Sequence, residues 1–271
     1  MHCCVAFYAA LSDVFSLYHS IIVAGDGRYF NAEAMQIIFR LLAGNGVSNI
    51  WVPKHGIMST PAVSAAIRNL NGGKAQGAIV LTASHNPGGP GEDFGIKYNE
   101  GFGQPAGEDF TDSVSKRFFI EVTTEASLHC LTECLKNCWK CFLELQVYEQ
   151  SLKIESFKTI QGSPDVDLNA AVGTTFSIGS STVTIIDPFE CYVDTLKTCF
   201  DFDKLRNFCQ RKGFTLLFDG MHGAGGPFAR RVFVEELGLP EVSALRILSI
   251  VVACRLVVDN AIYEKVPLLV F

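Results

Sequence analysis

A short apolar run that ends in a turn rich in glycine and proline constrains this chain more than any other feature. Gly77–Leu81 has the sequence Gly-Ala-Ile-Val-Leu, and it is followed directly by Thr82–Pro90, which has the sequence Thr-Ala-Ser-His-Asn-Pro-Gly-Gly-Pro. An apolar run of this length, bounded by turn residues, predicts a buried β-strand. Ser84 therefore leaves a rigid strand end and enters a loop whose backbone N–H groups can converge on an anion such as phosphate.

A second motif follows in Phe94–Asn99, where Lys97 stands seven residues after Pro90. A lysine close to a serine hydroxyl can neutralise a phosphate or carry a proton, so the two residues suit phosphoryl transfer. Taken alone, Ser84 is more typical of a serine that only shapes a turn, and Lys97 is also compatible with an ordinary solvated lysine.

Strand-like runs alternate with amphipathic stretches along much of the chain. This alternation predicts an α/β fold in which helices cover both faces of a sheet, and ligands of such sheets bind beyond the strand ends, where Ser84 falls. Asn31 and Thr60 are the expected helix N-caps, with Pro61 in the first helical position. The expected strands are 20–24, 49–52, 77–81, 182–186 and 215–218, and the expected helices are 31–43, 60–70, 192–210 and 227–237.

Together, Thr82–Pro90 and Asp93–Asn99 resemble the active-site signature of the α-D-phosphohexomutase family, in its eukaryotic phosphoglucomutase branch. The similarity covers residues 21–116 and resumes over 152–240. Three further segments agree with the family: Gly25–Phe30, Ser59–Val63 and Phe218–Gly223. The resemblance implies an α/β domain with a mixed sheet sandwiched between helices, followed by an incomplete second domain of similar kind.

The resemblance also implies a domain organisation. Residues 21–181 correspond to the first domain of the family, with an atypical insertion at 117–150, and residues 182–241 correspond to part of the second domain. Residues 1–20 and 242–271 match neither domain. We therefore expect a truncated member of the family.

The activity that the resemblance implies is the interconversion of glucose 1-phosphate and glucose 6-phosphate through a hexose bisphosphate. Ser84 is then carried as a phosphoserine, and Lys97 acts as general acid and base toward the sugar hydroxyl. His85 either orients Ser84 and contacts its phosphate or only holds the loop in shape. The candidates for binding phosphate are Thr82, Asn86 and Arg28, although the first two suit shaping the turn and a salt-bridged Arg28 is at least as compatible.

The implied cofactors are Mg²⁺ and glucose 1,6-bisphosphate, the latter as activator. In the family an Asp-Gly-Asp-Gly-Asp-Arg loop binds the Mg²⁺ together with the phosphoserine. This chain has no such loop, so Ser84, through its phosphate, is the one metal ligand expected here. A hard octahedral cation needs several oxygen ligands, and we expect little mutase turnover. The alternatives are a non-enzymatic phosphoprotein or interaction module, and an incomplete fragment that folds poorly.

Composition excludes several other classes of protein. The formal charge of −6 provides no basic face for nucleic acid, and the apolar stretches near both ends are not expected to span a membrane. Ten cysteines without paired spacing are expected to be reduced thiols of a cytoplasmic protein. If helical, the cluster Cys130, Cys134, Cys138 and Cys141 spans ~16 Å, too far for one zinc ion. Asp219–Gly223 is expected to be a tight turn, with His222 packed or hydrogen-bonded.

Overall fold

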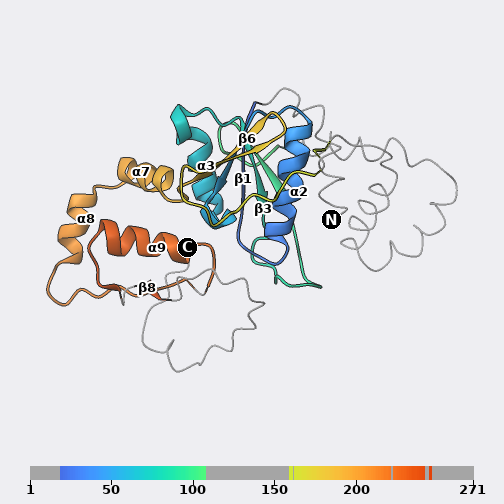
Figure 1. Cartoon of the computed structure of the whole chain (residues 1–271). Helices are drawn as coiled ribbons and strands as arrows, with labels where there is room; N and C mark the ends of the chain where they lie inside the picture. Colours follow the sequence, from blue (N-terminus) through green and yellow to red (C-terminus); the bar gives the residue numbers. More distant parts are fainter. Residues whose placement is uncertain (1–18, 108–158, 161, 221, 242–243, 246–271) are drawn as a thin grey trace.

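A six-stranded mixed sheet forms the centre of the computed structural model, which describes residues 19–107, 159–160, 162–220, 222–241 and 244–245 (Figure 1). The strand order is β4-β3-β1-β2-β6-β5; the four inner strands are parallel, and both edge strands are antiparallel to their neighbours. The predicted α/β class with a mixed sheet is therefore confirmed. The strands are β1 (Ser20–Gly25), β2 (Asn49–Pro53), β3 (Gly77–Leu81), β4 (Ile96–Glu100), β5 (Thr175–Ile178), β6 (Ser181–Ile186), and a separate pair β7 (Phe218–Asp219) and β8 (Ala244–Leu245).

Two helices cover the sheet on opposite faces, as predicted (Figure 1). In β1 the side chains alternate between them: Ile21 and Val23 pack with residues of α2 (Asn31–Gly44), and Ile22 and Ala24 with residues of α3 (Thr60–Asn69). Strands buried on both faces give continuous apolar sequences, which explains the runs in β1 and β3. The remaining helices are α7 (Glu190–Cys199), α8 (Phe202–Cys209), α9 (Gly226–Ala229) and three short or irregular turns, η1 (Lys54–Gly56), η2 (Leu70–Gly72) and η3 (Arg230–Glu236).

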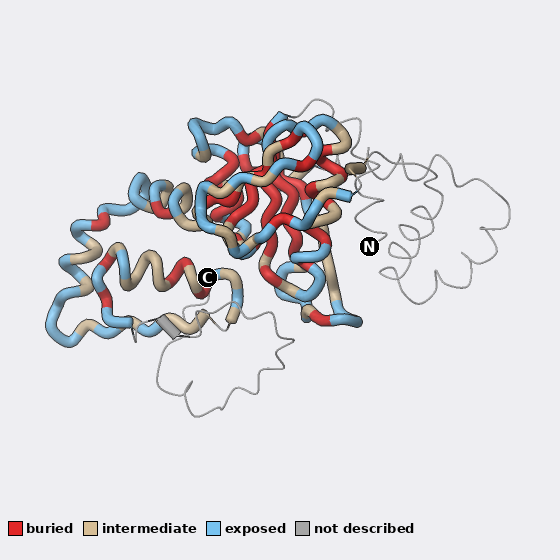
Figure 2. The backbone as a smooth tube through the Cα atoms, viewed as in Figure 1, coloured by how far each residue is buried: buried red, intermediate tan, exposed pale blue. Residues whose placement is uncertain are grey.

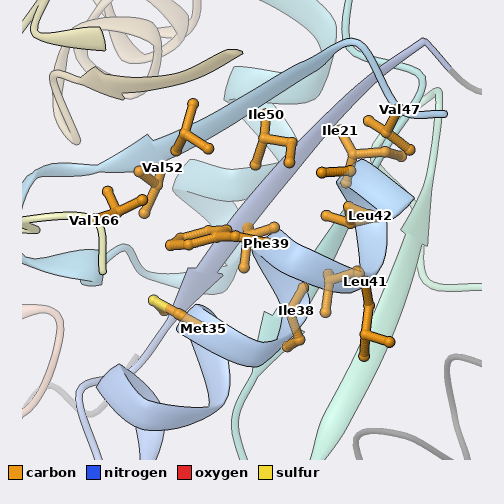
Figure 3. Close-up of a cluster of buried hydrophobic side chains, with 14 of the residues drawn as sticks. Ile21, Met35, Ile38, Phe39, Leu41, Leu42, Val47, Ile50, Val52 and Val166 are labelled. Atoms are coloured by element: carbon orange, nitrogen blue, oxygen red, sulfur yellow. The ribbon is translucent and has the colours of Figure 1, made fainter. Parts of the chain in front are cut away.

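The core on the α2 side is the larger of the two clusters. Phe39 lies at its centre between the sheet and Val166, fully buried, as Figure 3 shows. A fully buried aromatic side chain of this kind typically contributes several kcal/mol to stability, ~3–5 kcal/mol on truncation to alanine. Figure 2 shows that the buried residues concentrate in the sheet and the helices that cover it, whereas α7 and α8 are mostly exposed or half-buried.

Both helix starts lie one residue away from the predicted N-caps. Phe30, with φ of 70°, precedes α2, so Asn31 is the first helical residue and is buried. Its side-chain amide faces the preceding loop, next to Asp26, instead of capping the helix. Ser59 precedes α3, so Thr60 is the first helical residue and Pro61 the second.

The edge strands β4 and β5 were not predicted, because neither has a continuous apolar sequence. β6 was predicted over 182–186, but it was assigned to a second domain that begins at residue 182. It pairs with β2 along its whole length, with Asn49 opposite Thr182 and Pro53 opposite Ile186. The boundary at 181 would cut this sheet, so we propose a boundary after Ile186 instead. The predicted boundary after residue 20 falls inside β1, which begins at Ser20. The predicted insertion at 117–150 lies outside the described residues, and the predicted C-terminal segment begins at residue 242, where the described residues are interrupted.

The region after β6 also differs from its predicted elements. The helix predicted over 192–210 is two helices, because Phe200 is extended and the carboxylate of Asp201 accepts a hydrogen bond from the Lys204 N–H (3.0 Å) as the N-cap of α8. Of the strand predicted over 215–218, only Phe218 lies in a strand, as the first residue of the two-residue β7. The helix predicted over 227–237 is confirmed as α9 and its π-helical continuation η3.

Three of the ten cysteines lie within the described residues. Cys191, Cys199 and Cys209, the cysteines within these residues, are free thiols, and burial raises the pKa of Cys191. Throughout the same residues, no helix combines the length and the hydropathy that a membrane span requires. The cysteine cluster between 130 and 141 lies outside the described residues.

Glu236 joins α7, α8 and η3. Its carboxylate pairs with Lys197 (2.8 Å) and Arg231 (3.0 Å), and its backbone carbonyl accepts two hydrogen bonds from the guanidinium of Arg206 (2.9 and 3.2 Å). The hydrogen bond from Lys197, followed by the charges of Lys197, Arg231 and Arg206, lowers the pKa of this carboxyl despite its partial burial. The charged form of Glu236 is therefore the form that stabilises this helical layer.

Replacing Glu236 with glutamine should reduce the free energy of unfolding by about 1 kcal/mol at neutral pH. The pKa of Glu236 is lower in the folded protein than in the unfolded chain. Its contribution is thus present above the ordinary glutamate pKa of about 4.3 and is lost as the pH falls through the folded value. Denaturant titrations between pH 7 and 3 should show the two proteins converging at acid pH. Glu235→Gln, a change at a more exposed neighbouring carboxylate, is the control and should have the smaller effect; a difference for Glu236→Gln that persists unchanged at pH 3 would contradict this account.

Candidate active site around Ser84

The candidate site lies where β1 and β3 end, at the carboxyl edge of the parallel strands. Ser84 is exposed in the loop that leaves β3, and its φ is 58°. A residue other than glycine in the left-handed region costs roughly 1–2 kcal/mol, so the surrounding contacts must impose this conformation. The serine is therefore held in one presentation rather than left to the preferences of its own backbone.

Lys97 lies next to this serine because β4 returns along β3. The two strands pair antiparallel with Val80 opposite Lys97, and the Thr82 N–H donates to the Gly95 carbonyl (2.9 Å) to close the loop between them. Lys97 is exposed, and its Nζ donates a hydrogen bond to Ser84 Oγ at 2.7 Å. Two residues that were predicted from separate sequence motifs are therefore in direct contact.

The backbone N–H groups of Ser84 and Asn86 are engaged within the loop rather than directed at an anion. The Ser84 N–H donates to Thr82 Oγ1 (2.9 Å), and the Asn86 N–H donates to the Ala83 carbonyl (3.2 Å). The predicted nest of backbone donors is therefore wrong for these two groups, because local turn formation uses them. The charge-bearing group that the structure places on Ser84 Oγ is the ammonium of Lys97.

Asp26, which follows β1, accepts hydrogen bonds from both sides of the site. Thr82 Oγ1 donates to Asp26 Oδ2 (2.7 Å), so the buried threonine hydroxyl links Asp26 to the backbone of Ser84. The guanidinium of Arg28 forms an ion pair with the same carboxylate, with Nη2 at 2.8 Å and Nε at 3.0 and 3.1 Å from its oxygens. Asp26 was not among the residues predicted from sequence; its signal was an acidic residue between two glycines at the end of a buried strand beside the serine strand.

The remaining donors of Arg28 reach backbone carbonyls of the serine loop. Nη1 donates to the carbonyls of Asp93 (2.7 Å) and Asn86 (3.4 Å), and Nη2 donates to that of Ser84 (3.3 Å). With a side chain only 8% exposed, Arg28 has each of its three nitrogens engaged by protein acceptors. The sequence left two roles open for Arg28, phosphate binding and a salt bridge; in the structure Arg28 forms the salt bridge, with Asp26.

His85 and Asn86 follow the serine and are both exposed. Asn86 contributes its backbone to the loop, through its N–H to Ala83 and its carbonyl to Arg28. No hydrogen bond holds the His85 ring within the described part of the chain, so its side chain is open to solvent beside Ser84. Roles of these two residues toward a phosphate stay predictions.

The described residues contain no group of three or more histidine, cysteine, aspartate or glutamate side chains that is arranged to hold a metal ion. The carboxylate of Asp26, which lies beside the serine loop, is occupied by Arg28 and Thr82. The donor set around Ser84 therefore does not fit a carboxylate-bound Mg²⁺.

The turn after β7 is tight, as predicted, with the Gly223 N–H donating to the Gly220 carbonyl (2.7 Å) and φ of 60° at His222.

A serine loop at a strand end, with a lysine returned to it by an antiparallel edge strand, characterises this α/β domain. Residues 3–124 match the family model of phosphoglucomutase/phosphomannomutase, alpha/beta/alpha domain I. The chain is 40% identical to a probable cytoplasmic phosphoglucomutase of Arabidopsis thaliana and 41% identical to cytoplasmic phosphoglucomutase 1 of Zea mays, each over 231 residues. These alignments cover 83% of this chain and 34% of the relatives, so the chain spans about a third of their length.

Solved structures agree with this similarity. The exocytosis-sensitive phosphoprotein parafusin, a phosphoglucomutase from Paramecium, matches with a TM-score of 0.71 and 32% identity, over 92% of this chain and 40% of that one. A phosphomannomutase from Thermus thermophilus, 21% identical, shares the fold with a TM-score of 0.52 over 90% of this chain and 40% of that one. Residues 3–124 therefore form the first domain of the phosphoglucomutase/phosphomannomutase family.

A substitution at Gly95 would test how closely the segment before β4 must approach the end of β3. A Cβ at this position would lie 2.5 Å from the Thr82 carbonyl oxygen, which is backbone and cannot turn away. Gly95→Ala should therefore lower the free energy of unfolding by ~1–3 kcal/mol and separate Lys97 from Ser84. Gly91→Ala is the matched control in the same loop, because a Cβ there meets nothing within 4 Å. Thermal unfolding of both variants checks this, and equal stabilities would show that the strands have room to spare.

Proposed function

We propose that this chain carries out phosphoglucomutase-type phosphoryl transfer, with Ser84 as the phosphoryl carrier and Lys97 as the proton carrier. The observation that supports the proposal most directly is the 2.7 Å hydrogen bond from Lys97 Nζ to Ser84 Oγ. A proton carrier must lie within hydrogen-bond reach of the oxygen that it serves, and Lys97 Nζ does.

The proposed step balances with these two side chains. When phosphoserine donates to a sugar hydroxyl, the bond between phosphorus and Ser84 Oγ breaks and a bond between phosphorus and the sugar oxygen forms. Lys97 gives a proton to the departing Oγ and receives the proton that the sugar hydroxyl loses, so it begins and ends as the same species. In the reverse direction the serine hydroxyl attacks a sugar phosphate and the proton moves the other way.

The substrate class follows from the names of the relatives. Cytoplasmic phosphoglucomutases of plants and parafusin of Paramecium support hexose phosphates as substrates, with glucose 1-phosphate and glucose 6-phosphate as the pair that is interconverted, and the cytoplasm as the location. Glucose 1,6-bisphosphate is the proposed donor that loads Ser84. Mg²⁺ is proposed with the phosphate on Ser84 as its ligand, but no step is assigned to it, because the described residues supply no fitting carboxylates.

Incubation of the purified chain with glucose 1,6-bisphosphate, followed by mass spectrometry of the Ser84 peptide, tests the proposal. We expect one phosphoryl group on Ser84, no label in Ser84→Ala, and labelling slower by at least ~10²-fold in Lys97→Met. The controls are Ser177→Ala and Lys74→Met, exposed residues outside the Ser84 loop. Label that survives Ser84→Ala would refute the assignment, and a coupled assay of glucose 6-phosphate then measures full turnover, which we expect to be low.

A second candidate is a phosphoprotein that acts through binding rather than turnover. The similarity to parafusin, an exocytosis-sensitive phosphoprotein of Paramecium, favours keeping this candidate. If Ser84→Ala removes the phosphate and also abolishes capture of a partner, while no variant changes sugar phosphate turnover, the binding role is the better account.

A further inference from the structure

We propose that Arg28 is a positioning residue for the nucleophile: it holds the Ser84 loop in its left-handed conformation so that Oγ faces Lys97. The proposal rests on the proposed function, because that function makes Ser84 the reacting group. It goes beyond it in assigning a role to a side chain that touches neither the Oγ atom nor a substrate.

Arg28 binds backbone carbonyls of the Ser84 loop and has no nitrogen directed at a ligand. Its guanidinium donates to three carbonyls, those of Ser84, Asn86 and Asp93, which lie on both arms of the loop. One planar group with five donors in fixed directions can satisfy several carbonyls at once, which an ammonium cannot do. The three bonds therefore tie the serine turn to the segment that enters β4.

Asp26 supplies the counter-charge of Arg28 and also contacts Thr82; we call these three residues the bracket of the Ser84 loop. It accepts from the Arg28 backbone N–H (3.1 Å) as well as from the guanidinium, so both ends of the arginine are fixed by one carboxylate. The same carboxylate accepts from Thr82, whose oxygen in turn accepts from the Ser84 N–H. The φ of 58° at Ser84 is thus imposed from two directions, through its N–H and through its carbonyl.

Packing leaves this bracket little freedom to move. Gly88 lies against the stem of Arg28, where an added Cβ would be 3.2 Å from the Arg28 Cβ, and Thr82 is only 6% exposed. An ion pair that is largely withdrawn from water keeps its geometry because each partner alone would be a poorly solvated charge. We infer that its function here is geometric, since Arg28 has no donor left for a phosphate.

The test replaces the serine oxygen with a titratable probe that does not depend on mutase activity. In Ser84→Cys, the ammonium of Lys97 should favour the thiolate, so the midpoint of the pH–rate profile for alkylation by iodoacetamide should lie below that of an ordinary thiol, about 8.5. Adding Lys97→Met should return the midpoint to the ordinary value. If it does not, the contact that supports the proposed function is absent, whatever Arg28 does.

Adding Arg28→Lys to Ser84→Cys tests the inference itself. This change keeps the positive charge but not the three carbonyl bonds, so a shift of about one pH unit toward the ordinary value, and a roughly tenfold slower alkylation at neutral pH, is expected only if geometry matters. Glu236→Gln in the same background controls for lost stability, because it weakens a distant layer and should leave the profile unchanged. An unshifted profile in Arg28→Lys overturns the inference and leaves the proposed function intact.

Thr82 provides an independent pair of variants in case Arg28→Lys does not fold. Thr82→Ser keeps the hydroxyl that links Asp26 to the Ser84 N–H, whereas Thr82→Val removes it at nearly constant volume. Thr82→Val should shift the alkylation profile as Arg28→Lys does, and Thr82→Ser should preserve it. Equal profiles for the two Thr82 variants would show that the bracket does not control the serine.

Discussion

The burial of β1 on both faces is the constraint on which the rest of this structure depends. Its side chains Ile21–Ala24 are fully buried, alternately against α2 and α3, so the strand must be central and the helices must lie on opposite sides. Its neighbours β2 and β3 are parallel to it, which brings the carboxyl ends of all three strands to one edge. The Asp26 turn and the Ser84 loop are adjacent for this reason alone.

An ion pair at this edge acts through specificity more than through stability. A pair of charges withdrawn from water recovers little net free energy, because desolvation offsets much of their attraction. Asp26 and Arg28 nevertheless occupy a position where apolar residues would satisfy none of the three loop carbonyls that Arg28 reaches. The pair therefore selects one loop conformation among several that the glycines and prolines of this segment permit, and it does so on rigid strand ends.

Much of the fold could be predicted from the sequence, because β1, β2 and β3 are continuous apolar runs and α2 has a regular apolar face. The edge strand β4 could not, since Ile-Lys-Tyr-Asn-Glu buries only Tyr98 and Asn99 and has the polarity of a loop. The contact between Ser84 and Lys97 follows from the pairing of β4, so resemblance to a family suggested it where local pattern did not. The carbonyl partners of Arg28 could not be predicted from local pattern either, because Ser84, Asn86 and Asp93 are distant from it in sequence.

The different roles of the two cations follow from their chemistry. A guanidinium has many donors in a rigid plane and does not give up its proton, so it suits bonds that must not change during a reaction. An ammonium on a flexible stem can follow an oxygen and exchange a proton with it. The structure places the arginine on fixed carbonyls and the lysine on Ser84 Oγ. Because the amides of Ser84 and Asn86 are used inside the loop, the negative charge that develops on Ser84 Oγ in the proposed reaction is stabilised by the ammonium of Lys97. Arg28 holds the loop so that Ser84 Oγ and Lys97 keep the same relative geometry.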